Sequence, residues 1–241
     1  MNEHTVKKYD EELTALRTML AQMGGLAEDQ LGKAIDALVG RDTEAADRII
    51  ATDDKIDALE LAIEEKAILT IAKRQPMALD LREIMVSIRV ASDLERIGDL
   101  AKNIAKRTHA ISDDHPGRIM MGLARMGRLA LGQLKDVLDA FAQHDDTKAL
   151  EVWRSDEEID ALYNSIFREL LTYMMEDPRT IGLCTHLLFG AKNIERIGDH
   201  ATNIAETIHF LVQGTQLRAA RPKGDESSYA VVKPANGGAP Q

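Results

Sequence analysis

The segment ERIGDLAKNIA at residues 95–105 recurs one hundred positions later as ERIGDHATNIA at residues 195–205. The two copies differ at only two of their eleven positions. A repeat of this length and fidelity indicates that the chain contains two copies of one structural unit. In each copy a glutamate, an aspartate and an asparagine stand four residues apart, so a helix would place their oxygen atoms in one stripe.

Similarity between the two halves continues outside this segment. LAQMGGLA at 20–27 matches LARMGRLA at 123–130, and DDKIDAL at 53–59 matches DEEIDAL at 156–162. Each half is therefore expected to contain the same helices in the same order.

Local signals mark where helices begin and where they pack closely. Asp42, Asp145 and the pair Asp177-Pro178 are expected to cap helix N-termini. Gly24 and Gly127 occupy matching positions inside the first helix of each half. Because glycine lowers helix propensity, we expect these two residues to permit either a close helix contact or a kink.

The spacing of chain breakers predicts the architecture. Segments of roughly 30 residues with helical periodicity lie between them, and short connections make consecutive helices antiparallel neighbours. The sequence therefore predicts an all-α fold of six long helices, arranged as two tandem three-helix bundles at residues 1–113 and 114–213. Residues 214–241, rich in proline and glycine, are expected to form a disordered tail.

Charge and composition narrow the classes of function. The chain has 40 acidic and 30 basic residues, a formal net charge of −10. This balance disfavours nucleic-acid binding and electrostatic attachment to a membrane, and it suits a cation or a basic partner. The single cysteine, Cys184, is expected to be a small buried residue. Because the sequence shows no signal peptide and no apolar run of membrane-spanning length, we expect a cytoplasmic protein.

The acidic stripes are the candidate functional feature. On a helical wheel they lie away from the apolar positions, so we expect the carboxylates to face the bundle surface or a neighbouring helix. Acidic residues of the second helix in each half would lie beside the repeated segment if these helices are neighbours. All-oxygen clusters suit hard cations such as Mg²⁺, Ca²⁺ and Mn²⁺, and also iron. The candidate metal ligands are Asp53, Asp57, Glu95, Asp99 and Asn103 in the first half, and Asp156, Asp160, Glu195, Asp199 and Asn203 in the second.

Other readings of these residues stay open. The same duplication could preserve a packing or docking surface. The sequence contains no Ser/His/Asp set, Walker loop or glycine-rich nucleotide fingerprint, which favours a non-enzymatic role. A carboxylate-bridged metalloenzyme and a metal-storage protein are the alternatives. His200 corresponds to Leu100 in the first half and is expected to be structural, whereas Glu206-x-x-His209 has no copy there and is expected to be a chance match to a metal-ligand spacing.

The longer motifs carry a family resemblance. They are AKRQP at 72–76, DLR at 80–82, LERIGD at 94–99, DPR at 177–179, HLLF at 186–189 and AKNIERIGDHATNIAE at 191–206. Over roughly residues 5–213 the chain resembles the PhoU family of phosphate-specific transport system accessory or regulatory proteins. The resemblance implies two PhoU domains, each a three-helix bundle. It also implies metal clusters (Fe, Mn, Mg or Zn) at the Glu/Asp-x-x-x-Asp motifs, which fall on the aspartate and glutamate candidates named above.

The resemblance further implies a function. A member of this family would be a negative regulator of the phosphate-starvation (Pho) regulon. It would act between the ATPase subunit of the phosphate ABC transporter and a sensor histidine kinase. The resemblance implies a homodimer, and neither nucleic-acid binding nor membrane insertion is expected.

Overall fold

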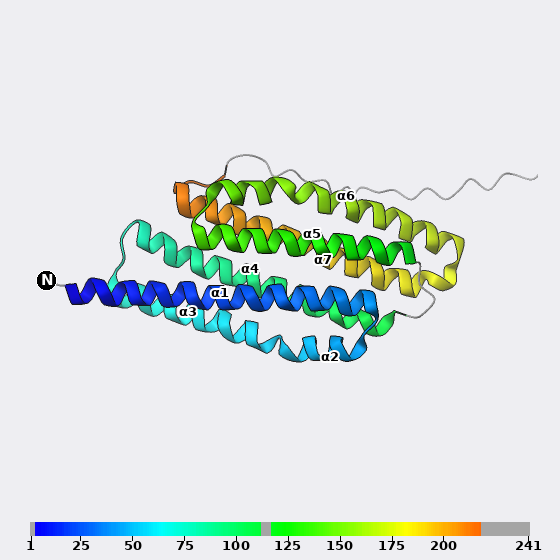
Figure 1. The fold of residues 1–241 in the computed structure, drawn as a ribbon, viewed down its shortest axis with the longest axis horizontal. Coiled ribbons are helices and arrows are strands. Elements are labelled where there is room, and N and C mark those ends of the chain that lie inside the picture. The colour runs from blue at the N-terminus through cyan, green and yellow to red at the C-terminus, as the bar shows by residue number, and fades with distance from the viewer. Residues whose placement is uncertain (1–2, 112–116, 218–241) are drawn as a thin grey trace, which may run out of the picture.

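The structure is a computed structural model that describes residues 3–111 and 117–217. All of its regular elements within those ranges are helical, which confirms the all-α prediction (Figure 1). The helices are α1 (Glu3–Gly40), α2 (Thr43–Thr52), α3 (Asp54–Arg74) and α4 (Leu79–Arg107) in the first half, and α5 (Gly117–Gln143), α6 (Asp146–Glu176) and α7 (Ile181–Gln213) in the second. Short 3₁₀ turns follow α4 at Thr108–Ala110 and precede α7 at Pro178–Thr180. The predicted tail lies almost entirely outside the described residues, as does most of the connection before α5.

The two halves pack side by side. Helices α1 and α4 contact α5 and α7, while α2 and α3 flank one side and α6 the other (Figure 1). With 38 residues, α1 is about 57 Å long at 1.5 Å per residue, which gives the molecule its elongated shape. None of the described helices has the length and apolarity that a membrane crossing requires.

Three aspartates cap the N-termini at which the sequence analysis expected them. Asp42 accepts a hydrogen bond from the backbone N–H of Ala45 at the start of α2, and Asp145 accepts one from Lys148 at the start of α6. Asp177 caps the 3₁₀ turn that Pro178 opens, just before α7. These contacts satisfy backbone donors that the first helical turn leaves without partners.

The second helix of the first half departs from the prediction. It divides at Asp53 into α2 and α3, whereas its counterpart α6 runs unbroken through Asp156. The carbonyl of Asp53 accepts from the N–H of Ile56 at 2.8 Å, a tightening toward 3₁₀ geometry. Asp53 itself keeps helical dihedral angles, with φ −59° and ψ −38°.

Glycines set the spacing between α1 and α5. A Cβ atom on Gly127 would lie 2.6–2.8 Å from three side-chain atoms of Ile35, and one on Gly24 would lie 2.7 Å from Leu138. Close helix contact, one of the two expected explanations, therefore holds at both matching positions. Gly132 in α5 has nothing within 4 Å of the same point.

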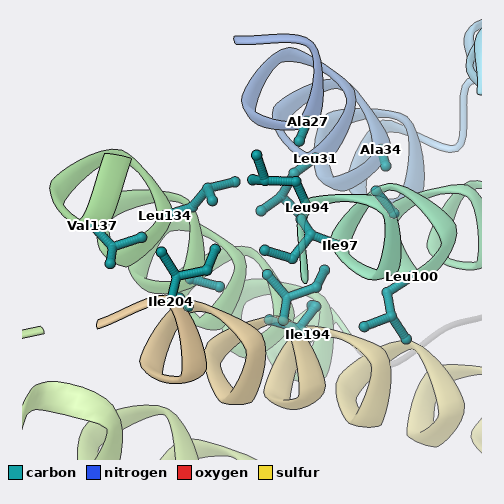
Figure 2. Close-up of a cluster of buried hydrophobic side chains, with 14 of the residues drawn as sticks. Ala27, Leu31, Ala34, Leu94, Ile97, Leu100, Leu134, Val137, Ile194 and Ile204 are labelled. Atoms are coloured by element: carbon teal, nitrogen blue, oxygen red, sulfur yellow. The ribbon is translucent and has the colours of Figure 1, made fainter. Parts of the chain in front are cut away.

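A continuous apolar core joins the halves. Leu31 of α1, Ile97 of α4, Leu134 of α5 and Ile194 of α7 are fully buried and face one another (Figure 2). Each such side chain contributes about 1.5–3 kcal/mol through its removal from water. Cys184 is also fully buried, as predicted. The core thus fixes the rotation of α4 and α7, and with it the direction of their acidic stripes.

Candidate functional site

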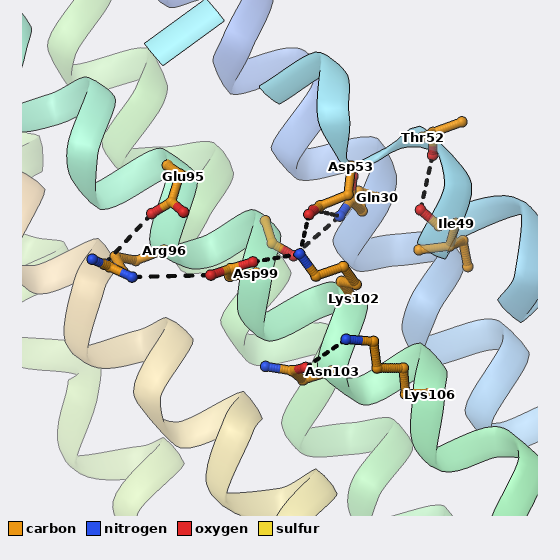
Figure 3. Close-up of polar contacts among 11 residues, drawn as sticks. Gln30, Ile49, Thr52, Asp53, Glu95, Arg96, Asp99, Lys102, Asn103 and Lys106 are labelled. Atoms are coloured by element: carbon orange, nitrogen blue, oxygen red, sulfur yellow. Dashed lines mark hydrogen bonds and ion pairs between the residues drawn. The ribbon is translucent and has the colours of Figure 1, made fainter. Parts of the chain in front are cut away.

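The first-half site forms where α4 passes the junction of α2 and α3. Ile97 and Ala101 of α4 are buried in the core, which turns Glu95 and Asp99 toward that junction. Figure 3 shows Asp53 at the end of α2 and Asp99 on α4 directed toward the same lysine. The two helices are therefore neighbours, and Asp53 and Asp99 of their stripes lie next to each other.

The carboxylates of this site face a neighbouring helix, which is one of the two directions expected from the sequence. Asp53 is only 2% exposed, and the side chains of Glu95 and Asp99 are 16% and 34% exposed. The aspartate of the second helix points at α4 and not at solvent. The helical wheel correctly placed each acidic stripe on the side of its helix away from the apolar positions. The neighbouring helix packs close to that side and covers part of the stripe.

A lysine bridges the two aspartates of this site. Lys102 Nζ donates to Asp53 Oδ2 and, at 2.6 Å, to Asp99 Oδ1. Gln30 Nε2 donates to the other oxygen of Asp53 at 2.7 Å and to the carbonyl of Gly98 at 3.0 Å (Figure 3). Burial alone lowers the pKa of Lys102, but its hydrogen bonds to both carboxylates outweigh burial and hold that pKa well above its usual range.

The remaining carboxylates of the first half are crowded. Burial, with Asp53 close by, raises the pKa of the Asp57 carboxyl. Burial also raises the pKa of Glu95, and nearby Asp99 adds to this, whereas Arg96 opposes it. Arg96 Nε lies 3.5 Å from Glu95. These shifts place Asp53, Asp57, Glu95 and Asp99 in one electrostatic group.

The second-half site is more deeply buried. Asp156, Asp160 and Glu195 are 2%, 3% and 5% exposed. Lys192 Nζ lies 2.8 Å from Glu195 Oε1 and 4.8 Å from the ring centre of Tyr163. Charged groups this deep are stable only with close partners or a bound cation.

Two side-chain oxygen atoms lie close to Gly198 in the second half. A Cβ on Gly198 would lie 3.0 Å from Asp156 Oδ1 and 3.3 Å from Gln133 Oε1. Gln133 is 7% exposed, its Nε2 donates to Ser155 Oγ at 3.2 Å, and its Oε1 has no hydrogen-bond partner in the described part of the chain. The absence of a side chain at Gly198 leaves room beside these two oxygen atoms.

Asn103 and Asn203, both predicted metal ligands, do not join the clusters of carboxylates. Asn103 Oδ1 is 3.5 Å from Lys106 Nζ, and Asn203 is exposed. Within residues 3–111 and 117–217, no three His, Cys, Asp or Glu side chains stand ready to hold a metal ion together. A metal would therefore require the carboxylates to turn toward one another.

Two glutamines of the sites were missed by sequence reasoning. Gln30 and Gln133 occupy matching positions of the repeat, 103 residues apart. Gln30 donates a hydrogen bond to Asp53, and the side-chain oxygen of Gln133 lies beside Gly198, as does Asp156 Oδ1. That shared position was the available signal. Because neither glutamine is charged, neither was selected as a candidate site residue.

His200, Glu206 and His209, which were not expected to bind metal, have structural contacts. His200 Nδ1 lies 2.8 Å from Asp93 Oδ1 on α4 and so ties the two halves together. Glu206 accepts a hydrogen bond from Trp153 Nε1 at 2.9 Å. His209 Nδ1 lies 2.8 Å from Asp146 at the start of α6. Each contact holds helices of the second half in place or joins them to α4.

Comparison with known proteins assigns the family. The PhoU domain model matches residues 20–108 and 123–208, once in each half. The chain belongs to the PhoU family. A phosphate-specific transport system accessory protein PhoU homolog of Rhizobium meliloti is 56% identical over 93% of this chain and 95% of its own length. A protein of the same description from Caulobacter vibrioides is 53% identical over 93% of this chain and 98% of its own length.

Solved PhoU structures share the fold. PhoU from Pseudomonas aeruginosa covers 86% of this chain with a TM-score of 0.81 at 39% identity. The phosphate transport system regulatory protein PhoU from Streptococcus pneumoniae covers 88% with a TM-score of 0.82 at 32% identity. Each is covered over its whole length. The two matched PhoU domains agree with the duplication seen in the sequence.

The two PhoU domains fit a metal ion to different degrees. In the first, the Lys102 ammonium stands between the aspartates, so the residues as arranged do not fit a cation there. In the second, buried carboxylates and the Gln133 oxygen, which has no hydrogen-bond partner among the described residues, are hard oxygen donors of the kind that Mg²⁺ or Mn²⁺ prefers, but the Lys192 ammonium also lies there, 2.8 Å from Glu195.

Proposed function

We propose that this PhoU-family protein is a non-enzymatic regulator of phosphate homeostasis that restrains the phosphate-starvation (Pho) regulon. It would act between the phosphate ABC transporter and a sensor histidine kinase. The observation that carries the proposal is 56% identity, over nearly the whole length of both chains, to a phosphate-specific transport system accessory protein. Long exposed helices and a net charge of −10 offer surfaces for protein contacts.

Co-purification from cells tests whether the protein associates with the transporter and the sensor kinase. The tagged full chain is recovered from membranes solubilised after growth in high and in low phosphate, and the kinase and the transporter ATPase are identified by mass spectrometry. The proposal predicts recovery of both proteins in at least one condition. Recovery of neither, while the tagged chain itself complements a deletion, would rule out the adaptor role. Light scattering of the purified chain tests the proposed homodimer.

We also propose that the buried carboxylates of this protein bind a divalent cation such as Mn²⁺, Mg²⁺, Fe²⁺ or Zn²⁺. The supporting observations are the burial of Asp156, Asp160 and Glu195, and the position of the Gln133 oxygen beside Gly198, where Asp156 Oδ1 also lies. Like charges in such proximity repel one another; Lys192 beside Glu195 offsets part of that repulsion, and a divalent cation would offset more of it and link α5, α6 and α7. In this proposal Asp156 and Asp160 hold the ion from α6, and Glu195 and Asp199 hold it from α7.

Elemental analysis tests this second proposal. Protein purified without chelator is exposed to Mn²⁺, desalted and measured for metal per chain. Uptake near one equivalent or more supports the site. Less than about a tenth of an equivalent, with no rise in thermal stability on adding Mn²⁺, contradicts it.

A further inference from the structure

The start of α4 carries apolar side chains that its neighbours leave exposed. Leu81 and Met85 stand four residues apart, so they share one face of the helix, and both are exposed. Met77 and Leu79, at the corner between α3 and α4, are exposed as well. We call these four residues the corner patch. Large apolar side chains gathered at one place on a surface are typical of an interaction site.

The end of α7 lies beside the corner patch. Arg82 Nη1 donates to the carbonyl of Leu211 at 3.2 Å, which joins the first turn of α4 to the last turn of α7 (Figure 1). A Cβ on Gly214, the residue that ends α7, would lie 2.7 Å from the same guanidinium. Leu217 still packs against the core. The C-terminal segment, residues 218–241, therefore starts from the same end of the molecule as the corner patch.

Positive charge borders the apolar side chains of α4. The guanidinium carbons of Arg82 and Arg89 lie 5.5 and 5.6 Å from the ring centre of Phe210 in α7. Neither arginine forms an ion pair with a carboxylate in the described part of the chain. Because Arg89 follows Met85 by four residues, as Met85 follows Leu81, the helix presents its charge and the two apolar side chains on one face. That face suits a segment that is both apolar and acidic.

We propose that residues 225–232 of this same chain, with the sequence DESSYAVV, dock on the corner patch. The acidic pair at 225–226 lies beside Arg82 and Arg89, and the run YAVV at 229–232 covers the apolar side chains. This run is the longest apolar stretch of the C-terminal segment. The contact is independent of metal binding and of the proposed place between transporter and kinase.

The length of the connection suits this contact. The run YAVV begins twelve residues after Leu217, and a linker of that length spans about 20 Å on average. Glu226 and Val231 are up to about 17 Å apart when the chain between them is extended. Leu81 and Arg89 are about 12 Å apart along α4, at 1.5 Å per residue. The acidic pair and the apolar run can therefore reach their partners at the same time.

Apolar burial provides most of the stabilisation of this contact. Exposed ion pairs contribute little, because water and salt screen them and two long side chains lose freedom. The arginines instead determine which way the segment lies along α4. Docking should therefore persist at high salt and depend mainly on the apolar run.

Cross-linking of paired cysteines in the full chain tests the proposal. Cys184 is fully buried, so cysteines introduced at the surface can react with each other alone. Met85→Cys or, as the control, Asp80→Cys is combined with Ser228→Cys. Asp80 is also exposed and belongs to the same first turns, but it lies about 140° from Met85 around α4. At low protein concentration, we expect the Met85→Cys pair to form its intrachain disulfide at least about tenfold faster than the control pair.

Further substitutions in the Met85→Cys pair identify what holds the segment. Tyr229→Ser together with Val231→Ser should lower the rate to that of the control pair. Both residues lie outside the described helices, so circular dichroism should show unchanged helicity. Arg89→Glu should slow the reaction by only about two- to fivefold, and Arg89→Lys, which keeps the charge, should leave it unchanged.

Three results would overturn the proposal. One is an equal rate for the two cysteine pairs. Another is a faster rate that Tyr229→Ser with Val231→Ser does not lower. The third is a disulfide that joins two chains, recognised by a doubled mass at low concentration, which would show that a second copy covers the patch. None of these results bears on phosphate regulation or on metal binding, so either of those proposals can fail or hold separately.

Discussion

Substitution of Gly127 by alanine tests the packing of the two halves against each other. The added Cβ would lie 2.6–2.8 Å from the Cδ1, Cγ1 and Cγ2 atoms of Ile35. Two of these atoms branch directly from the Ile35 Cβ, and Ile35 is 5% exposed, so the side chain has little room to move away. Either α1 and α5 separate or the isoleucine adopts an unfavourable rotamer.

The size of the effect follows from two opposing contributions. Alanine in a helix interior is favoured over glycine by about 1 kcal/mol. Overpacking in a filled core costs about 1–3 kcal/mol. Gly127→Ala is therefore expected to lower the free energy of unfolding by about 0–2 kcal/mol, whereas Gly132→Ala, with nothing within 4 Å, should raise it by up to about 1 kcal/mol.

Thermal unfolding followed by circular dichroism measures the difference. The two variants should be separated by about 1–3 kcal/mol, and each kcal/mol shifts the Tm by about 2–4 °C for a chain of this size. Gly24→Ala should fall between them, because it meets only the mobile end of the Leu138 side chain. If Gly127→Ala melts at or above Gly132→Ala, the close contact between α1 and α5 is wrong.

Other substitutions test the site and the helix ends. Glu95→Gln should stabilise the metal-free protein at pH 7, because burial raises the pKa of Glu95. A carboxyl with a raised folded-state pKa favours folding below its unfolded pKa of about 4.3 and loses that contribution as pH rises through the folded value. The advantage of Glu95→Gln should therefore vanish below about pH 4, and urea titrations with EDTA at several pH values measure it; an advantage unchanged at low pH would contradict the cause. Lys102→Met should destabilise the protein by up to about 3–5 kcal/mol, because it leaves the buried charge of Asp53 without its ammonium partner. The double variant Lys102→Met with Asp53→Asn should recover part of that loss, and no recovery would show that the lysine acts through other contacts. Asp145→Ala should cost about 1 kcal/mol by removing the cap of α6, whereas Asp145→Asn should cost less; equal losses in urea unfolding would exclude a capping role.

Much of the fold could be predicted because the duplication revealed it. The repeated segment indicated two equivalent units, and the aspartate caps marked where α2 and α6 begin. Matching glycines indicated a close contact, although only the structure identifies Ile35 and Leu138 as the partners. Periodicity gives the face that a residue occupies on its own helix, but it does not identify the helix that packs there.

For the same reason the candidate site was predicted only in outline. Helical spacing aligned Glu95 with Asp99, and the structure brings Asp53 beside them. The role of Lys102 depends on a distance between helices that no spacing rule supplies. The division of the second helix at Asp53 was also missed, because nothing in the repeat distinguishes that residue from Asp156.

The most direct test of the proposed function is alkaline phosphatase activity in cells grown in phosphate-rich medium, with and without the gene for this chain. We expect high activity only in the deletion strain, a return to low activity when the wild-type chain is supplied, and low activity again when the sensor kinase is deleted as well. Equally low activity with and without the gene would contradict a role for this protein in restraining the phosphate-starvation response.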